Sequence, residues 1–301
     1  MGIPTIHAKI LFYSKTLGVS FDNTLMLGRQ NLYTSKKDVM AYARKFFDSD
    51  LIADKDFEES EYSEPLFKNL GAGLIDSMDN STYEGATIIH DLNLPVGDQL
   101  KDKYNAIVDG GTLEHIFNFP IGVKNCMEML QVGGHFISFV PANNECGHGF
   151  YQFSPELFYR VFCQENGFEV KLMAMHGGDG TSRTTDIFLV KDPDEMNNRV
   201  ELLSNNPVTI IVVAKKIEES KVFELSPQQS DYSNTWTAHE NSLREISDIE
   251  VSPLRAFYRK KIPKKIRDFL YHIYDEKIRY KKKNYRGFAK IHKNYVEKLK
   301  I

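Results

Sequence analysis

The sequence has few cysteines and no long hydrophobic run. Its only cysteines, Cys126, Cys146 and Cys163, form no CxxC pair, which argues against a disulfide framework and predicts free thiols in a reducing compartment. No stretch approaches the roughly 18 apolar residues that span a bilayer, and the first residues lack the charged, apolar and cleavage regions of a signal peptide. The sequence therefore predicts a cytoplasmic protein.

The chain as a whole has no large excess of either charge, since its net charge is only -3. Its last 51 residues and the rest of the chain, however, carry opposite net charges. Residues 251–301 hold 17 Lys and Arg against 4 Asp and Glu, whereas residues 1–250 hold 21 against 37. This pattern predicts an acidic body with a basic tail. Apolar residues at helical spacing predict a basic amphipathic helix near residues 264–280. They are Ile266, Phe269, Leu270, Ile273 and Tyr274.

Three roles are open for the basic tail. It could dock on the acidic body or on a second subunit, or it could rest as an amphipathic helix on the anionic inner surface of a membrane. Its Lys, Arg and Tyr residues could also contact nucleic-acid phosphates and bases. An acidic body argues against a broad nucleic-acid footprint, so nucleic acid is the least favoured partner.

Seven apolar runs of strand length alternate with helical patterns, which is typical of a buried, largely parallel sheet. The runs are residues 24–28, 73–78, 86–92, 104–110, 134–141, 168–176 and 208–216. The predicted fold is α/β: a Rossmann-like, doubly wound, mostly parallel seven-stranded sheet with a basic C-terminal helical extension. The predicted division is an α/β domain over 1–217, a linker or irregular segment over 218–252, and the extension over 253–301.

Two helices have boundary signals. Ser154 suits an N-cap, Pro155 the first helical position and Gly167 a left-handed C-terminal cap, which predicts one helix between them. An apolar face formed by Val123, Met127 and Leu130 predicts a second helix, which ends near residues 133–134.

Glycine is scarce in the turn after the first of these strands. The segment "TLMLGRQ" has only Gly28, where doubly wound enzymes normally place two or three glycines against a nucleotide-like cofactor. Because a missing Cβ permits close approach, Arg29 and Gln30 either point away from a cofactor or take its place.

Four segments, taken in order and spacing, resemble class I S-adenosylmethionine-dependent methyltransferases. They are "TLMLGRQ", "DSMDNSTYEGATIIHDLN", "YNAIVDGGTLEHIFN" and "MLQVGGHFISFVP". The resemblance covers roughly residues 20–217 and is strongest to small-molecule and glycan-cluster methyltransferase-like proteins. It implies S-adenosylmethionine as the cofactor and a small molecule or a sugar or glycan intermediate as the acceptor. The chain departs from the family pattern at Met26, where an acidic residue is usual, and at Gly28–Gln30.

Three carboxylates follow predicted strands. Asp79 can accept hydrogen bonds from ribose hydroxyls, or it can bond its own turn in "MDNST". For Asp91, the resemblance implies contact with the adenine amino group, while a capping role is equally open. Asp109 ends the fourth strand at the carboxyl edge, where open α/β sheets bind ligands.

Three further positions complete the predicted cofactor site. Gly110, directly after Asp109, would let a ligand lie against the backbone. Gly28 and Arg29 come from the turn after the first strand.

Two histidines are candidates for the base that accepts the acceptor's proton, because the unperturbed pKa of histidine, about 6.5, suits that task. His115 lies in "LEHI", which resembles a recurrent Glu-His pair of the family, and it could instead pack at a helix start. His148 lies between two glycines in the loop after the fifth strand, and it could instead belong to a plain surface loop. Cys146 lies near His148, but no second pair at ligand spacing accompanies them, so no metal site is expected.

Two functional classes remain. The favoured one is a methyltransferase, and the alternative is a non-catalytic interaction protein of the same fold whose cofactor site Gly28–Gln30 has closed. A third hypothesis, an RNA methyltransferase that captures its substrate through the tail, lacks an Asn-Pro-Pro-Tyr type of segment after the fourth strand.

Overall fold

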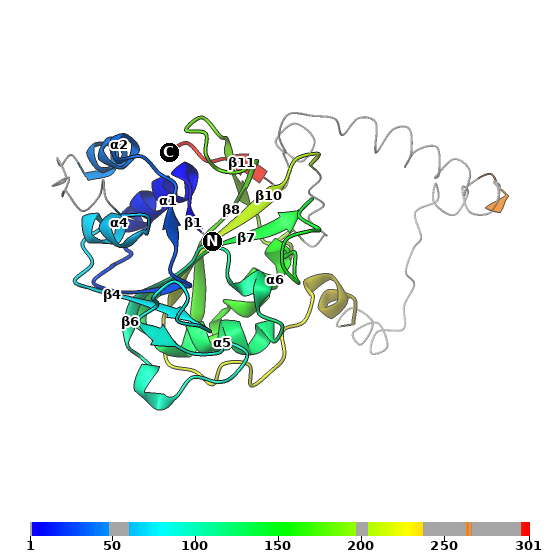
Figure 1. Ribbon diagram of the computed structural model, residues 1–301. Coiled ribbons are helices and arrows are strands. Elements are labelled where there is room, and N and C mark those ends of the chain that lie inside the picture. The colour runs from blue at the N-terminus through cyan, green and yellow to red at the C-terminus, as the bar shows by residue number, and fades with distance from the viewer. Residues whose placement is uncertain (1, 48–59, 197–203, 237–262, 265, 267–295) are drawn as a thin grey trace.

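A computed structural model describes residues 2–47, 60–196, 204–236, 263–264, 266 and 296–301. Its centre is a nine-stranded sheet in the order β11-β9-β8-β10-β7-β6-β2-β4-β5 (Figure 1). The strands are β2 (Asn23–Leu27), β4 (Leu74–Asp79), β5 (Ile88–Ile89), β6 (Tyr104–Asp109), β7 (Leu130–Asn143), β8 (Phe168–Gly177), β9 (Ile187–Val190), β10 (Val208–Lys216) and β11 (Val296–Lys298). A separate parallel pair joins β1 (Gly2–Ile3) to β3 (Asn31–Leu32).

The structure confirms an α/β fold but corrects the predicted sheet. All seven predicted strands form, and β9 and β11 extend one edge, so the sheet has nine strands. Four neighbouring pairs are parallel, and the other four are antiparallel. The sheet is therefore mixed, because β10 reverses between β7 and β8, and β9 and β11 each add an antiparallel neighbour.

The parallel half of the sheet has Rossmann-like topology. Numbered along the chain from β2, the strands β5-β4-β2-β6-β7 follow the order 3-2-1-4-5 of a doubly wound sheet. The order reverses between β2 and β6, and open α/β sheets bind ligands at such a switch point. The register there pairs Leu27 with Asp109 of β6 and with Met78 of β4.

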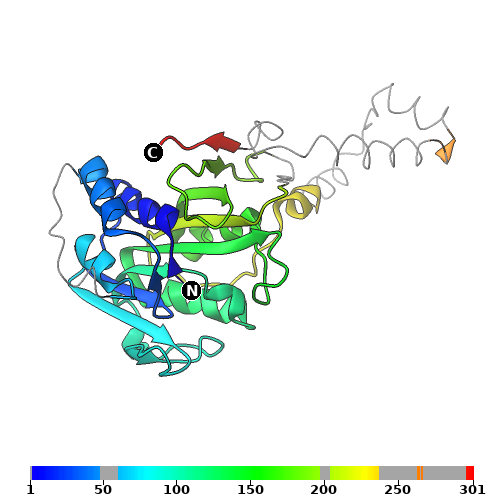
Figure 2. The same cartoon turned by 45° about the horizontal axis from the view of Figure 1, so that its top comes forward.

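Helices cover both faces of the sheet (Figures 1 and 2). They are α1 (Thr5–Thr16), α2 (Lys36–Phe47), α4 (Glu64–Asn69), α5 (Phe119–Met129) and α6 (Pro155–Val161), with short 3-10 helices η1 (Asp98–Leu100), η2 (Leu113–His115) and η3 (Gln164–Asn166). Alternate residues of β2 enter two cores, since Leu25 and Leu27 pack with residues of α5 and α6, and Met26 packs with residues of α1, α2 and α4. This alternation places the two helical layers on opposite faces.

The helix predicted from Ser154 to Gly167 begins as expected but ends early. The Ser154 hydroxyl caps it by accepting from the Leu157 N–H at 3.4 Å. The α-helix stops at Val161, whose carbonyl accepts from the Asn166 side-chain amide at 2.9 Å. The 3-10 helix η3 follows, and Gly167 closes it in the predicted left-handed conformation, with φ 75°.

The helix predicted to end near residues 133–134 ends at Met129, and Leu130 already belongs to β7. Gly133 and Gly134 lie inside this strand instead, where its pairing with β6 shifts register. Gly133 has φ +88°, a conformation that glycine adopts without steric cost. The two glycines therefore mark a bulge within the strand.

The end of the chain packs on its own body. Strand β11 pairs with β9, the Leu299 N–H donates to the Ile187 carbonyl at 2.8 Å, and Lys298 forms an ion pair with Asp186 at 2.6 Å (Figure 2). Apart from Lys264 and Ile266, the basic helix predicted near 264–280 lies outside the described residues. None of the helices that the structure describes has the length and apolar character that a membrane span requires.

Candidate functional site

The five parallel strands β5-β4-β2-β6-β7 end along one edge of the sheet, and the switch point divides them. Because Leu27 pairs with both Met78 and Asp109, the turn at Gly28 lies between the ends of β4 and β6. Asp79 pairs with Ile89, so β5 ends next to it and leads into Asp91 two residues later. Three of the carboxylates predicted from the sequence thus lie along one edge, on both sides of the switch point.

The turn after β2 is tight, and a side chain fills the space beneath it. Gly28 has φ 69°, and its N–H donates to the Met78 carbonyl at 2.7 Å. The fully buried Gln30 side chain donates to the Val108 carbonyl at 2.8 Å and to the Leu27 carbonyl at 3.3 Å. A Cβ on Gly110 would lie 2.9 Å from Cδ of Gln30, so Gly110 makes room for this side chain. The Gln30 side chain therefore fills the space beneath the turn at the switch point, and we call it the floor of the switch point.

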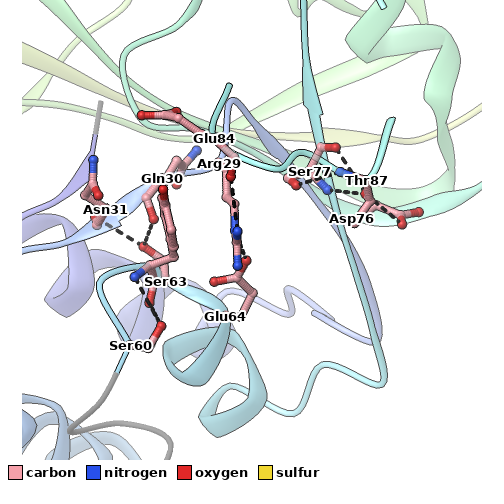
Figure 3. Close-up of polar contacts among 11 residues, drawn as sticks. Arg29, Gln30, Asn31, Ser60, Ser63, Glu64, Asp76, Ser77, Glu84 and Thr87 are labelled. Carbon is pink, nitrogen blue, oxygen red and sulfur yellow. Dashed lines mark hydrogen bonds and ion pairs between the residues drawn. The ribbon is translucent and has the colours of Figure 1, made fainter. Parts of the chain in front are cut away.

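Arg29 is held on the flank of the same turn (Figure 3). Its Nε lies 2.7 Å from Oε1 of Glu64 in α4, and its Nη1 donates to the Glu84 carbonyl at 3.1 Å. The guanidinium also lies 4.0 Å from the centre of the Tyr62 ring. Arg29 thus ties the turn to α4 and to the connection between β4 and β5, while Gln30 occupies the floor.

Asp79 and Asp91 each bond their own turn through one oxygen. Oδ1 of Asp79 accepts from the Ser81 N–H at 3.1 Å. Oδ1 of Asp91 accepts from the backbone N–H of Asn93 at 2.9 Å and from its side-chain amide at 2.8 Å. These hydrogen bonds, the backbone one first, lower the pKa of Asp91. The second oxygen of both carboxylates accepts no hydrogen bond from the described residues and is available to a ligand.

Asp109 is a buried cap rather than an open ligand group. Its Oδ1 accepts from the backbone N–H groups of Thr112 at 2.8 Å, Gly111 at 3.3 Å and Leu113 at 3.4 Å. Its Oδ2 accepts from the Ser138 hydroxyl at 2.8 Å. Burial raises its pKa to about 6 against the opposing effect of these hydrogen bonds. Asp109 therefore shapes the backbone that follows β6.

The two candidate histidines meet at a third residue, Glu114. Glu114 and His115 lie in η2, and His148 comes from the loop after β7. The Glu114 carbonyl pins that loop, since it accepts from the N–H groups of Phe150 at 2.7 Å and Tyr151 at 3.2 Å. The His115 and His148 ring centres are 5.1 Å apart.

The Glu114 carboxylate is buried without a hydrogen-bond donor among the described residues. The residue is 1% exposed, and neither side-chain oxygen accepts a hydrogen bond from the described part of the chain. Nε2 of His148 lies 3.3 Å from Oε1, but it is not aligned for a hydrogen bond. Burial first, and the nearby Asp109 second, raise the pKa of Glu114 to about 8. Burial, followed by His148, lowers the pKa of His115.

Glu114 is the residue that sequence reasoning does not single out. The Glu-His pair of "LEHI" includes Glu114, but only its histidine, His115, is a candidate for the base. Its burial and its approach to His148 depend on the loop after β7 folding back onto η2.

No family model and no curated protein sequence matches this chain. Among solved structures, it is similar to a putative methyltransferase from Bacillus halodurans, with 9% identity, 69% of this chain and 99% of the other covered, and a TM-score of 0.38. A second is 1,6-didemethyltoxoflavin-N1-methyltransferase of Burkholderia thailandensis with bound S-adenosylhomocysteine, with 13% identity, 71% and 78% coverage, and a TM-score of 0.36.

A third similar structure is a mutein of the branched-chain polyamine synthase of Thermus thermophilus, with 11% identity and a TM-score of 0.35. The match takes in 74% of this chain and spans only 59% of the synthase. At such identities and TM-scores, the likenesses by themselves decide neither the activity nor the substrate.

Proposed function

We propose that the chain is an S-adenosylmethionine-dependent methyltransferase that acts on a small molecule, with a sugar or glycan intermediate as the narrower candidate acceptor. One observation carries the proposal. The carboxyl edge of the sheet presents, side by side, Asp91 after β5, Asp79 at the end of β4 and the turn at Gly28, which lies at the switch point. Carboxylates at such strand ends recognise the hydroxyls of a nucleoside.

Asp79 and Asp91, which we call the rim of this edge, could hold an adenosine group. Asp79 retains an unengaged oxygen for ribose hydroxyls, and Asp91 retains one for the adenine amino group. Gly28 lies in the turn at the switch point, and because it carries no Cβ, a ligand can approach the backbone there. When bound, S-adenosylmethionine supplies an electrophilic methyl group on a sulfonium centre.

The acceptor would lie against the cluster of Glu114, His115 and His148. Methyl transfer depends mainly on positioning and, for a hydroxyl acceptor, on removal of one proton. The lowered pKa of His115 keeps its imidazole neutral at neutral pH, as a proton acceptor requires. His148, whose side chain is 54% exposed, is the alternative acceptor of that proton.

Gln30 favours a second candidate function, a non-catalytic interaction protein of the same fold. Its side chain takes the space that Gly110 leaves, and it bonds the carbonyls at both strand ends. A cofactor would then have to be held by the rim residues Asp79 and Asp91 alone. If these residues do not bind the cofactor, the α/β body serves instead as a module that binds another protein or ligand without catalysis.

The test is calorimetric titration of S-adenosylmethionine and S-adenosylhomocysteine into the purified chain. We expect saturable binding, weakened by about 1–3 kcal/mol in Asp79→Ala, because bound hydroxyls lose a charged acceptor. Asp98→Ala is the matched control, since it removes an exposed carboxylate of η1 that lies off the strand ends.

Absence of binding at millimolar ligand, in folded protein without copurified cofactor, would contradict the proposal and favour the interaction protein. If Asp79→Ala and Asp98→Ala weakened cofactor binding equally, Asp79 would not be a cofactor-binding residue.

A further inference from the structure

We propose that Glu114, His115 and His148 bind a divalent first-row transition-metal cation. Their candidate ligand atoms, one carboxylate oxygen and two imidazole nitrogens, all lie within 4.8 Å of one another. The proposal departs from the expectation drawn from the sequence, which considered only cysteine and histidine pairs. Binding of the cation itself does not depend on the proposed methyl transfer.

The buried carboxylate is the observation that points to a ligand. Buried polar groups are nearly always hydrogen-bonded, and a buried carboxyl without a partner is costly. Glu114 is 1% exposed, and both of its oxygens lack a donor among the described residues, although His148 lies 3.3 Å away. A cation bound by Glu114 and both histidines would satisfy this group.

The backbone around Glu114 is built to hold the two segments together. Two N–H groups of the loop after β7 donate to the Glu114 carbonyl, and the Tyr151 hydroxyl donates to the Phe117 carbonyl at 2.6 Å. Gly149 has φ +71°, and a Cβ there would lie 2.8 Å from the Glu114 carbonyl oxygen. Only glycine lets the loop pass this close, and the passage brings His148 to the carboxylate.

The donor set selects the kind of cation. Two imidazoles and one carboxylate suit zinc and its neighbours, and this set with an open fourth position is found in catalytic zinc sites. Bonds of about 2.0–2.2 Å in a tetrahedral site place ligand atoms roughly 3.3–3.5 Å apart. Since no pair of ligand atoms is more than 4.8 Å apart, the widest pair must close by about 1.4 Å at most, a movement that the exposed His115 and His148 can make around a fixed Glu114.

In the reaction, a role for the cation rests on the proposed function. A cation in this cluster would lie where the acceptor binds and could orient an acceptor oxygen and lower its pKa. The two imidazoles would then act as ligands, and the cation would replace them as the group that promotes loss of the proton.

The experiment is titration of Co²⁺ into the untagged full-length chain without cofactor, followed by calorimetry and by visible absorption. We expect one equivalent to bind with the absorption of a four- or five-coordinate ion. His148→Ala and Glu114→Gln should each weaken binding at least roughly tenfold. His148 lies in an exposed loop, so its variant tests the site even if Glu114→Gln fails to fold.

Two control variants should bind Co²⁺ as the wild type does. Glu145→Gln removes a negative charge from the same loop, and Cys146→Ser removes the exposed thiol two residues before His148. Failure of the wild type to bind Co²⁺, unchanged affinity in His148→Ala, or a thiolate-to-cobalt absorption band would overturn the proposal. Saturable S-adenosylmethionine binding alongside such a failure would leave the methyltransferase proposal standing, so the two can fail separately.

Discussion

At the scale of single residues, the switch point is closed from below by side chains that satisfy backbone carbonyls. Gln30 donates to Val108 and Leu27, and the Thr112 hydroxyl donates to the same Leu27 carbonyl at 2.7 Å. Leu27 is the last residue of β2 and Val108 is the last but one of β6, so both carbonyls lie at or beside the end of a strand. The floor is therefore held by hydrogen-bonded side chains, whereas doubly wound folds that bind dinucleotides place glycines at this turn, close to the ligand.

Replacing Gln30 tests this role. Gln30→Ala should lower the free energy of unfolding by about 1–3 kcal/mol, because the Val108 carbonyl loses its side-chain donor, whereas the Leu27 carbonyl still accepts from the Thr112 hydroxyl. Urea denaturation measures the change. Gln99→Ala, an exposed glutamine of η1, should change it by less than about 0.5 kcal/mol. A Gln30→Ala protein as stable as the wild type would show that the hydrogen bonds donated by the Gln30 side chain make no net contribution to the free energy of unfolding.

At the scale of elements, glycines decide where the chain turns back on itself. Gly149 brings the loop after β7 onto η2, and Gly133 forms the bulge in β7. Gly167 caps η3 directly before β8, and its carbonyl accepts from the Ile217 N–H at 2.8 Å. These positions set how the site and the sheet meet the following segments.

Substitution of Gly167 should be costly. Its φ is +75°, and a Cβ would lie 2.5 Å from the Glu218 carbonyl oxygen, so strain and a backbone clash both oppose alanine. Gly167→Ala should destabilise the protein by at least about 1–2 kcal/mol in thermal or urea unfolding.

Gly147→Ala is the matched control for this substitution. Gly147 has no positive φ, and no atom lies within 4 Å of the position that an added Cβ would take, so its change should be neutral or slightly stabilising. Equal effects of the two substitutions would contradict a conformational role for Gly167.

At the scale of the whole molecule, several ionisable side chains are buried between the sheet and the helices that cover its two faces. His7 and His176 share a hydrogen bond of 3.1 Å between their Nε2 atoms, and His135 is buried in β7 without a hydrogen bond at either ring nitrogen from the described residues. Burial lowers the pKa of His176 and of His135 to about 4 and that of His7 well below 6.5. Buried Asp109 and Glu114 have raised pKa values, so they affect stability in the opposite direction.

The pH dependence of His135 can be isolated with His135→Leu. Its folded pKa of about 4 lies below the unfolded value of about 6.5, so its neutral form contributes fully above pH 6.5 and this contribution is lost as the pH falls. Relative to His135→Leu, the wild type should lose about 1.4 kcal/mol of unfolding free energy per pH unit between those two values. Urea denaturation from pH 7.5 to 4 measures this, and parallel curves for the two proteins would contradict it.

Local patterns in the sequence determined much of the fold. Seven apolar runs predicted seven strands that form, and Ser154 and Gly167 predicted a cap and a left-handed turn that are present, because burial and backbone preference act on neighbouring residues. The same patterns placed Asp79 and Asp91 at strand ends. They did not predict β9 or β11, since the pairing of such short strands depends on which neighbour offers free backbone groups.

Only the tertiary structure decided how distant residues use one another. It placed the Gln30 amide between two strand ends, engaged both oxygens of Asp109 within the chain, and brought His115 and His148 to a buried Glu114. The contacts of Gln30 with Val108, of Asp109 with Ser138 and of Glu114 with His148 join segments that lie apart in the sequence, so spacing along the chain carries no information about them. The sequence thus determined which strands form and which chemical groups end them, while packing of the loops decided which groups remain free to bind a ligand.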